Sequence, residues 1–367
     1  MSGFNAVFRK ELTQMFRDRG TLFFALLVPV AEMILFGVID MNAKNIPTVV
    51  FDQSRTQESR RLIDQFGATS YLKVVKYAQS RQEIQHEIVA GHEQVAIEIP
   101  PDYARNLAMG READVLVAID GSDSTVASQA LNAANGVVLM NAIDELINRR
   151  HAHPPVEARP LMLFNPDMRS ANLLIPGLIA ILLTFSGTIL SAFAIVKERE
   201  RGTLEQLMVT PVSPLAVVTG KLLPYLFLAY VQLIIILILM NLLFRVPIHG
   251  SISLLLILSP VYLLSLLSVG LLVSSKAKTQ MEAMQRAMSV MLPSVLLSGY
   301  IFPIASLPLP LRVISHILPA TYYIRIARGI VIRGATFWDL WESVAALVFM
   351  SIVLIGVSAR AFRKTVS

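Results

Sequence analysis

Long apolar runs without charge are the feature that most limits what this chain can fold into. Residues 173–196, 222–244 and 251–275 contain no charged side chain. About 20 mostly apolar residues are enough to cross the roughly 30 Å of hydrocarbon in a bilayer. Charged residues make up only 16% of the chain, against about 25% in a typical soluble domain. We therefore expect a mostly α-helical polytopic membrane protein, and neither a soluble enzyme nor a nucleic-acid-binding protein.

Three further runs bring the predicted number of transmembrane helices to six. Residues 21–39 form the first and contain a single charge, Glu32, while residues 343–359 form the last. The fifth run, 287–311, is uncharged but contains four prolines, so we expect it to break near its outer end. No small-residue cleavage site follows the first run, which we expect to remain in the membrane as a signal anchor.

Residues 1–20 precede the first span and carry an amphipathic pattern. Apolar side chains recur at helical spacing between Phe4 and Phe16, while Arg9, Lys10 and Arg17 fall on other faces. This pattern is typical of an interfacial helix that lies on the membrane surface. The alternative is an ordinary helical leader.

The distribution of Lys and Arg predicts the orientation, because cytoplasmic loops carry an excess of both residues. They precede the first span, recur in 197–221 and 276–286, and end the chain. We therefore expect both termini and these two loops in the cytoplasm. The opposite side also carries arginines, which are an exception to the pattern: Arg245, Arg312, Arg325, Arg328 and Arg333.

Between the first two spans, residues 40–172 are polar and have the pattern of an inserted α/β domain outside the cytoplasm. This insert holds 13 Lys or Arg and 17 Asp or Glu. β-Branched runs at 48–51, 72–77, 94–99 and 114–119 predict strands. Ser54–Gln57 and Ser80–Glu83 fit capping boxes at helix starts, and we expect further helices at 101–109 and 125–149.

Motifs for bound cofactors are missing from the sequence. It contains no G-x-x-x-x-G-K-[ST] and no G-x-G-x-x-G, so we expect no nucleotide site, no catalytic residue and no metal on this chain. His151 and His153 fit a solvated linker better than a metal site, and Asp120–Asp123 fits a capped turn better than a calcium loop.

Glu32 is the intramembrane candidate residue, because a carboxylate inside a span is costly and is commonly functional. Two interpretations stay open. In the first, it has a structural role: it pairs with Lys, Arg or a hydroxyl of a neighbouring span, or lies near the outer interface. In the second, it binds an ion or substrate.

The loop 197–221 is the most informative segment. Gly202 breaks the helix that leaves the second span, and Thr203–Gln206 fits a capping box for a new helix starting at Leu204. Thr210-Pro211 ends that helix, and Ser213-Pro214 supplies a cap and first residue for the next one. A short, doubly capped helix suits docking of a cytosolic partner, whereas a solvated loop would need no such caps.

The segment 198–213, ERERGTLEQLMVTPVS, strongly resembles the corresponding segment of ABC exporter permeases of the type-2 class. The resemblance covers the whole chain: an interfacial helix at 1–20, one span at 21–39, a large domain at 40–172 and five spans in 173–367. It extends to 297–334, where these permeases carry short re-entrant helices. The chain looks most like bacterial inner-membrane multidrug-export permeases that have a large periplasmic domain.

The resemblance implies the permease subunit of an ATP-driven exporter for hydrophobic or amphiphilic compounds such as drugs. Two such chains, identical or paralogous, would assemble with ABC ATPase subunits, which hold the ATP and Mg²⁺. A periplasmic adaptor and an outer-membrane channel are further implied partners, and nucleic acid is not. The coupling contact with the ATPase would involve Glu198, Arg199, Glu200, Gly202, Thr203, Leu204, Glu205 and Gln206.

Two other function classes remain as alternatives. An ion-gradient-driven secondary transporter would commonly show repeated halves and several intramembrane charges, whereas this sequence offers only Glu32 within a span. A membrane-anchored sensor would require a cytoplasmic signalling domain, and the five spans of 173–367 leave no segment for one.

Overall fold

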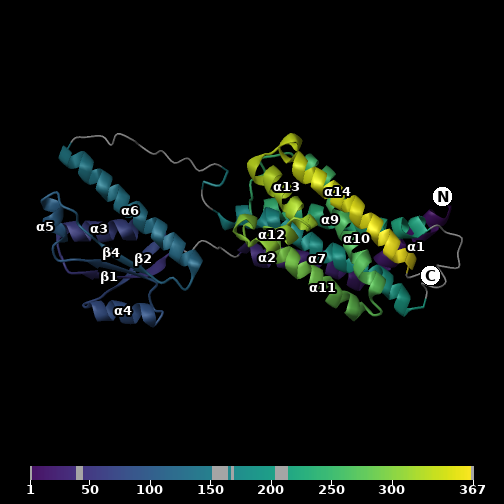
Figure 1. The fold of residues 1–367 in the computed structure, drawn as a ribbon, viewed down its shortest axis with the longest axis horizontal. Coiled ribbons are helices and arrows are strands. Elements are labelled where there is room, and N and C mark those ends of the chain that lie inside the picture. Colours follow the sequence, from purple (N-terminus) through teal and green to yellow (C-terminus); the bar gives the residue numbers. More distant parts are fainter. Residues whose placement is uncertain (1, 39–43, 151–163, 167–168, 203–213, 365–367) are drawn as a thin grey trace. The chain divides into compact units, whose positions relative to one another are not determined.

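The chain forms two compact units in the computed structural model (Figure 1), which describes residues 2–38, 44–150, 164–166, 169–202 and 214–364. One unit comprises residues 40–162, and the other comprises residues 1–39 together with 163–367. The first is an α/β domain, and the second is a bundle of helices.

The α/β domain is built on a four-stranded sheet in the order β2-β1-β3-β4. β1 runs parallel to both of its neighbours, and β4 is antiparallel to β3. The strands and helices of this unit are β1 (Ile46–Asp52), α3 (Gln57–Ala68), β2 (Leu72–Tyr77), α4 (Arg81–Val89), β3 (Val95–Ile99), α5 (Tyr103–Ala108), β4 (Leu116–Ile119) and α6 (Ser124–Arg150).

Helices cover both faces of this sheet. Because successive strand residues point to opposite faces, Val50 packs with Phe66 of α3 and Ala134 of α6 on one side. Val49 packs with Ile84 of α4 on the other. Figure 1 shows the same layering, with α4 alone below the sheet and α3 and α6 above it.

The cap predicted at Ser54 is wrong, because α3 is capped by Thr56. The Thr56 hydroxyl accepts a hydrogen bond from the backbone N–H of Ser59 at 3.2 Å. Arg55 has φ +52°, which lies outside the helical region, so no helix can start at Ser54. The cap at Ser80 is confirmed, since its hydroxyl accepts from the Glu83 N–H.

The turn before α6 agrees with the capped-turn interpretation. An Asp123 carboxylate oxygen accepts hydrogen bonds from the N–H groups of Thr125 and Val126 at 2.9 and 3.2 Å. His151 and His153 lie outside the described residues.

The described residues of the second unit form helices joined by short connections. Its elements are α1 (Ser2–Arg17), α2 (Arg19–Val38), α7 (Ser170–Glu200), α9 (Pro214–Leu242), α10 (Ile252–Lys276), α11 (Gln280–Leu297), the 3₁₀ turn η1 (Ile304–Ser306), α12 (Leu309–Ser315), α13 (Pro319–Arg333) and α14 (Phe337–Lys364). Within the described residues, five helices are long and apolar enough to cross a membrane: α2, α7, α9, α10 and α14.

The fifth predicted span, 287–311, differs from a continuous helix. Of 287–311, only the part up to Leu297 belongs to a long helix, and a left-handed Gly299 (φ +85°), η1 and α12 follow. Pro303, Pro308 and Pro310 each lack the N–H that a helix needs. The count of six spans therefore stays a prediction.

α7 lies at the centre of the bundle. Of its most apolar 18 residues, 78% are buried, against 17% for α2 and 22% for α14. Gly270 of α10 permits close approach, because a Cβ there would lie 2.3 Å from the Thr188 carbonyl oxygen. The rings of Tyr262 and Tyr323 stack 4.1 Å apart. Their hydroxyls bond Thr184 and Ser259 at 2.6 and 2.7 Å, so α7, α10 and α13 share one core.

Candidate functional site

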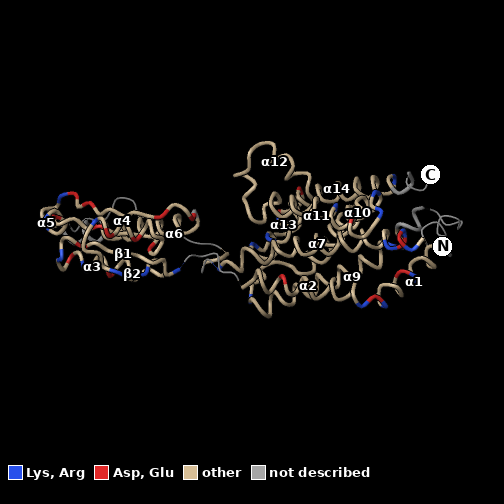
Figure 2. Tube along the Cα trace, turned by 90° about the horizontal axis from the view of Figure 1, so that it is seen from below, with Lys and Arg blue, Asp and Glu red and all other residues tan. Residues whose placement is uncertain are grey.

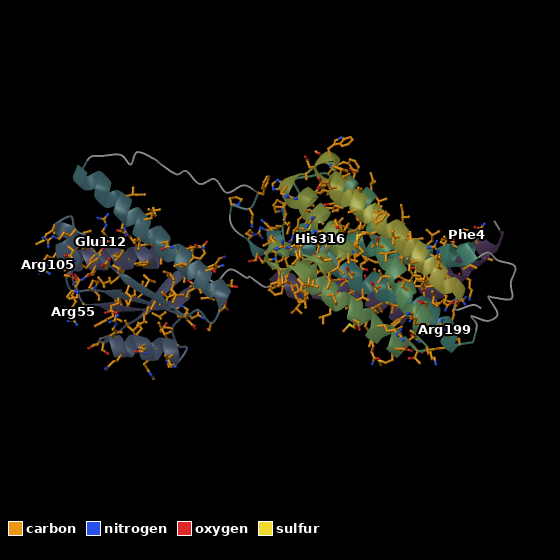
Figure 3. The ribbon with its side chains drawn as sticks, in the orientation of Figure 1. Phe4, Arg55, Arg105, Glu112, Arg199 and His316 are labelled. Atoms are coloured by element: carbon orange, nitrogen blue, oxygen red, sulfur yellow. The ribbon has the colours of Figure 1, made fainter. Side chains whose placement is uncertain are left out.

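Charged side chains gather at the end of the bundle that carries both chain termini, here called the terminal end (Figure 2). Figure 3 places Phe4 of α1 and Arg199 of α7 at this same end. α7 leaves the bundle here, and α9 enters it again after residues 203–213. The terminal end therefore holds both anchors of the loop that the sequence singles out.

A buried ion network joins these two anchors, and we define it as Lys10, Glu11, Glu198 and Lys221. The Lys221 ammonium lies 2.7 Å from a Glu11 carboxylate oxygen and 2.6 Å from one of Glu198. The side chains of all three are only 2 to 3% exposed. Lys10, which is 45% exposed, adds a second contact to Glu198 at 2.6 Å.

The ion network is balanced in charge and connects three helices. Two lysines face two carboxylates, contributed by α1, α7 and α9. Burial raises the pKa of Glu11, while its ion pair with Lys221 acts to lower it. A buried charge that loses its partner typically costs 3–5 kcal/mol, so the three helix ends are strongly tied to one another.

A second ion pair lies beside the network. Asp18, between α1 and α2, contacts the Lys197 ammonium of α7 and accepts a hydrogen bond from the Thr21 hydroxyl at 2.7 Å. The hydrogen bond from Lys197 lowers the pKa of Asp18 to about 2. Asp18 is therefore ionised at neutral pH, and it ties the start of α2 to the last turns of α7.

Arg199 and Glu200 fix the turn between α10 and α11. The Arg199 guanidinium donates to the carbonyls of Ser274 and Ser275 at 3.2 and 3.3 Å, and to that of Ala277. The Glu200 carboxylate accepts from the Gln280 N–H at 2.8 Å. The end of α7 is thus linked to both helices of the neighbouring loop.

Gly202 is where the chain turns away from α7. Its φ is +68°, and its N–H donates to the Arg199 carbonyl at 3.1 Å. This left-handed conformation after a helix favours glycine. Thr203, Leu204, Glu205 and Gln206 lie outside the described residues, so the predicted short helix remains a prediction.

Sequence reasoning missed the partners in these ion pairs. It read Lys10, Lys197 and Lys221 only as markers of orientation. Glu11 did carry a signal, because Val7, Glu11 and Met15 recur every four residues on one helix face, and all three are buried. A carboxylate in an otherwise apolar stripe indicates a buried partner on a neighbouring helix.

Glu32 lies apart from the ion network, midway along α2, and its side chain is half-buried. Among the described residues, no ion pair or hydrogen bond involves its carboxylate. The face of α2 around it is apolar and exposed, including Phe24 at 66% and Leu35 at 64%. The structure therefore supplies no cationic partner for Glu32 from the described part of its own chain.

The chain is similar to known proteins over almost its whole length. The family described as "ABC-2 family transporter protein" matches residues 19–360. The probable multidrug ABC transporter permease YbhS of Escherichia coli (strain K12) is 28% identical over 356 residues, which cover 95% of this chain and 93% of YbhS.

Two further relatives show the same likeness over different lengths. The inner membrane transport permease YhhJ of Escherichia coli (strain K12) is 27% identical, covering 97% of this chain and 96% of YhhJ. ABC transporter G family member 20 of Dictyostelium discoideum is 27% identical over 58% of this chain and 29% of its own length.

Proposed function

The chain belongs to the ABC-2 family of transporter proteins, and from this premise we propose how its terminal end serves transport. It is a multi-pass permease subunit of an ABC exporter, and ATP hydrolysis takes place in a separate ATPase subunit. We propose that the ATPase docks on residues 203–213. The observation that carries this proposal is the ion network, which joins both ends of that segment.

The contacts of the terminal end suit the transfer of motion. A push on 203–213 acts on Glu198 at one end and Lys221 at the other. Both are held by α1 through Lys10 and Glu11, and Arg199 holds the turn that leads into α11. Since a tightly packed, ion-paired unit moves as one body, the proposed result is a joint shift of α1, α7 and α9.

The proposed cargo is a hydrophobic or amphiphilic compound such as a drug. The relatives YbhS and YbhR are named as multidrug permeases, which supports this class. The exposed apolar face of α2 requires lipid or protein cover, and we propose a second permease chain, identical or paralogous. A periplasmic adaptor and outer-membrane channel belong to the same proposal.

The proposed topology has the terminal end in the cytoplasm, residues 40–162 in the periplasm and α1 on the inner surface of the bacterial inner membrane. Ser122→Cys should react with an impermeant maleimide in intact spheroplasts, because Ser122 is exposed in the α/β domain. Ser213→Cys should react only after permeabilisation. The native chain has no cysteine and is the control for background. Labelling in the reverse order would contradict this topology.

Transport itself is tested with inside-out vesicles that contain the permease and its ATPase subunit. We expect ATP to drive uptake of a fluorescent hydrophobic cation, while an imposed proton gradient without ATP drives none. Uptake driven by the gradient alone would favour the secondary transporter instead.

In the same assay, Glu32→Gln separates the two interpretations of this residue. A substrate-binding carboxylate predicts loss of cation uptake at a normal protein level, with uncharged cargo still transported. If the carboxylate is structural, we expect a reduced protein level and an equal loss of transport for cationic and uncharged cargo. Unchanged transport of both would exclude either role.

A further inference from the structure

A cavity of about 570 Å³ lies at the end of the bundle opposite the terminal end. The first turns of α7, the segment after α11, η1 and α13 line it. Arg325, Arg328 and Arg333 contribute to its wall, and among the described residues no Asp or Glu does so. The cavity is therefore strongly cationic.

Two of the arginines in this region have structural roles. Arg328 donates to the carbonyls of Leu173, Gly299 and Tyr300 at 3.2, 2.9 and 3.1 Å. Arg312, which does not itself line the cavity, donates to the carbonyl of Ala305 at 2.7 Å. Both satisfy backbone acceptors where the helical pattern is interrupted.

Arg325 and Arg333 make no such backbone contact among the described residues. Both are exposed, and within the described part of the chain neither forms an ion pair or a hydrogen bond. Arg325 only lies over the Tyr322 ring, 5.9 Å from its centroid. On the proposed topology they also stand on the outer side, where the Lys and Arg bias of membrane proteins disfavours them. Two guanidinium groups thus line the cavity, and the described residues supply no anion for them.

Apart from Asn165 and Ser298, the rest of the wall is apolar. Leu173, Ile304, Ile324 and Ile332 line the same cavity. A guanidinium group presents paired donors that match the oxygens of a phosphate, and aliphatic walls favour a hydrocarbon chain. The cavity therefore combines the two features that an anionic amphiphile requires.

We propose that this cavity binds an amphiphile with a phosphate headgroup. Its head would contact Arg325 and Arg333, and its hydrocarbon chain would contact Ile304, Ile324 and Ile332. The ligand is either a phospholipid of the surrounding bilayer or a phosphate-bearing cargo. The proposal rests on the proposed function only for the side of the membrane. Its test uses neither ATP nor an ATPase, so either can fail without the other.

The test is binding of dodecyl phosphate to the full chain in a neutral maltoside detergent, followed as a dose-dependent rise in melting temperature. We expect saturable stabilisation by dodecyl phosphate and little effect of dodecyltrimethylammonium or inorganic phosphate at equal concentration. Arg325→Gln with Arg333→Gln should weaken the binding at least about tenfold, because each lost hydrogen bond to a charged group is worth about that factor.

Arg245→Gln is the matched control. Arg245 is an exposed arginine between α9 and α10 and does not line the cavity, so its loss should leave binding unchanged. The melting temperature of each variant without added amphiphile shows whether the variant is folded. Arg325→Glu alone is a second variant, beside the double variant, for testing the loss of binding. Equal binding by wild type and the double variant would overturn the proposal, as would equal stabilisation by the cationic amphiphile.

Lipid extraction distinguishes the two sources of ligand. If the occupant is a bilayer phospholipid, wild-type protein should retain phosphatidylglycerol through purification, and the double variant should lose it. If the occupant is cargo, neither protein retains lipid, while dodecyl phosphate still binds the wild type.

Discussion

Lys221→Met is expected to lower the free energy of unfolding by about 3–5 kcal/mol, the largest stability effect of any single substitution considered. Methionine resembles lysine in length but leaves the Glu11 and Glu198 carboxylates without their shared cation, in a site where all three side chains are at most 3% exposed. The measurement is thermal unfolding of the purified chain, with its yield from the membrane.

Arg286→Gln is the matched control for this prediction. Arg286 pairs with Glu282 at 2.7 Å, but the two side chains are 42 and 34% exposed, and such pairs contribute at most about 1 kcal/mol. Adding Glu11→Gln to Lys221→Met should restore part of the loss, because the remaining Glu198 keeps Lys10. If Lys221→Met unfolds like the wild type, the ion network does not hold the three helices together.

The sequence predicted the segments of this fold better than their contacts. Long apolar runs predicted the helices α2, α7, α9, α10 and α14, because a span is defined by local composition alone. The strands of the α/β domain followed from β-branched runs in the same way. α11 was the harder case, since the helix continues past Pro293 but ends at Leu297, before the left-handed Gly299.

The sequence predicted the part of the candidate site that belongs to α7, but not its ion-pair partners on other helices. Glu198 and Gly202 were identified from a local motif, and the motif also showed that a helix ends there. Lys221 lies 210 residues from Glu11, and no pattern in a single sequence connects positions so far apart. The excess of lysines at the terminal end has two physical explanations, membrane orientation and ion pairing, and the sequence favoured the first.

The largest functional effect is expected in the loop itself. Glu205→Lys reverses a charge in the segment proposed to dock the ATPase, and loss of an interface hot spot typically costs about 2 kcal/mol or more, over tenfold in affinity. We therefore expect the variant to weaken copurification of the ATPase subunit or to uncouple hydrolysis from export. The measurements are copurification and substrate-stimulated ATP hydrolysis in nanodiscs.

Gly202→Pro tests the same contact through the backbone. Proline fixes φ near −65°, whereas Gly202 has φ +68°, so the chain must leave α7 in another direction while the spans still insert. Gly202→Ala is the graded comparison. A Cβ there meets no atom of the described residues within 4 Å, and the left-handed backbone costs about 1–2 kcal/mol. We expect ATPase binding in the order wild type, alanine, proline. Because neither substitution removes a charge of the ion network, both variants should lose far less stability than Lys221→Met. Wild-type copurification and coupling in Glu205→Lys and Gly202→Pro alike would exclude 203–213 as the point where ATP hydrolysis drives the permease.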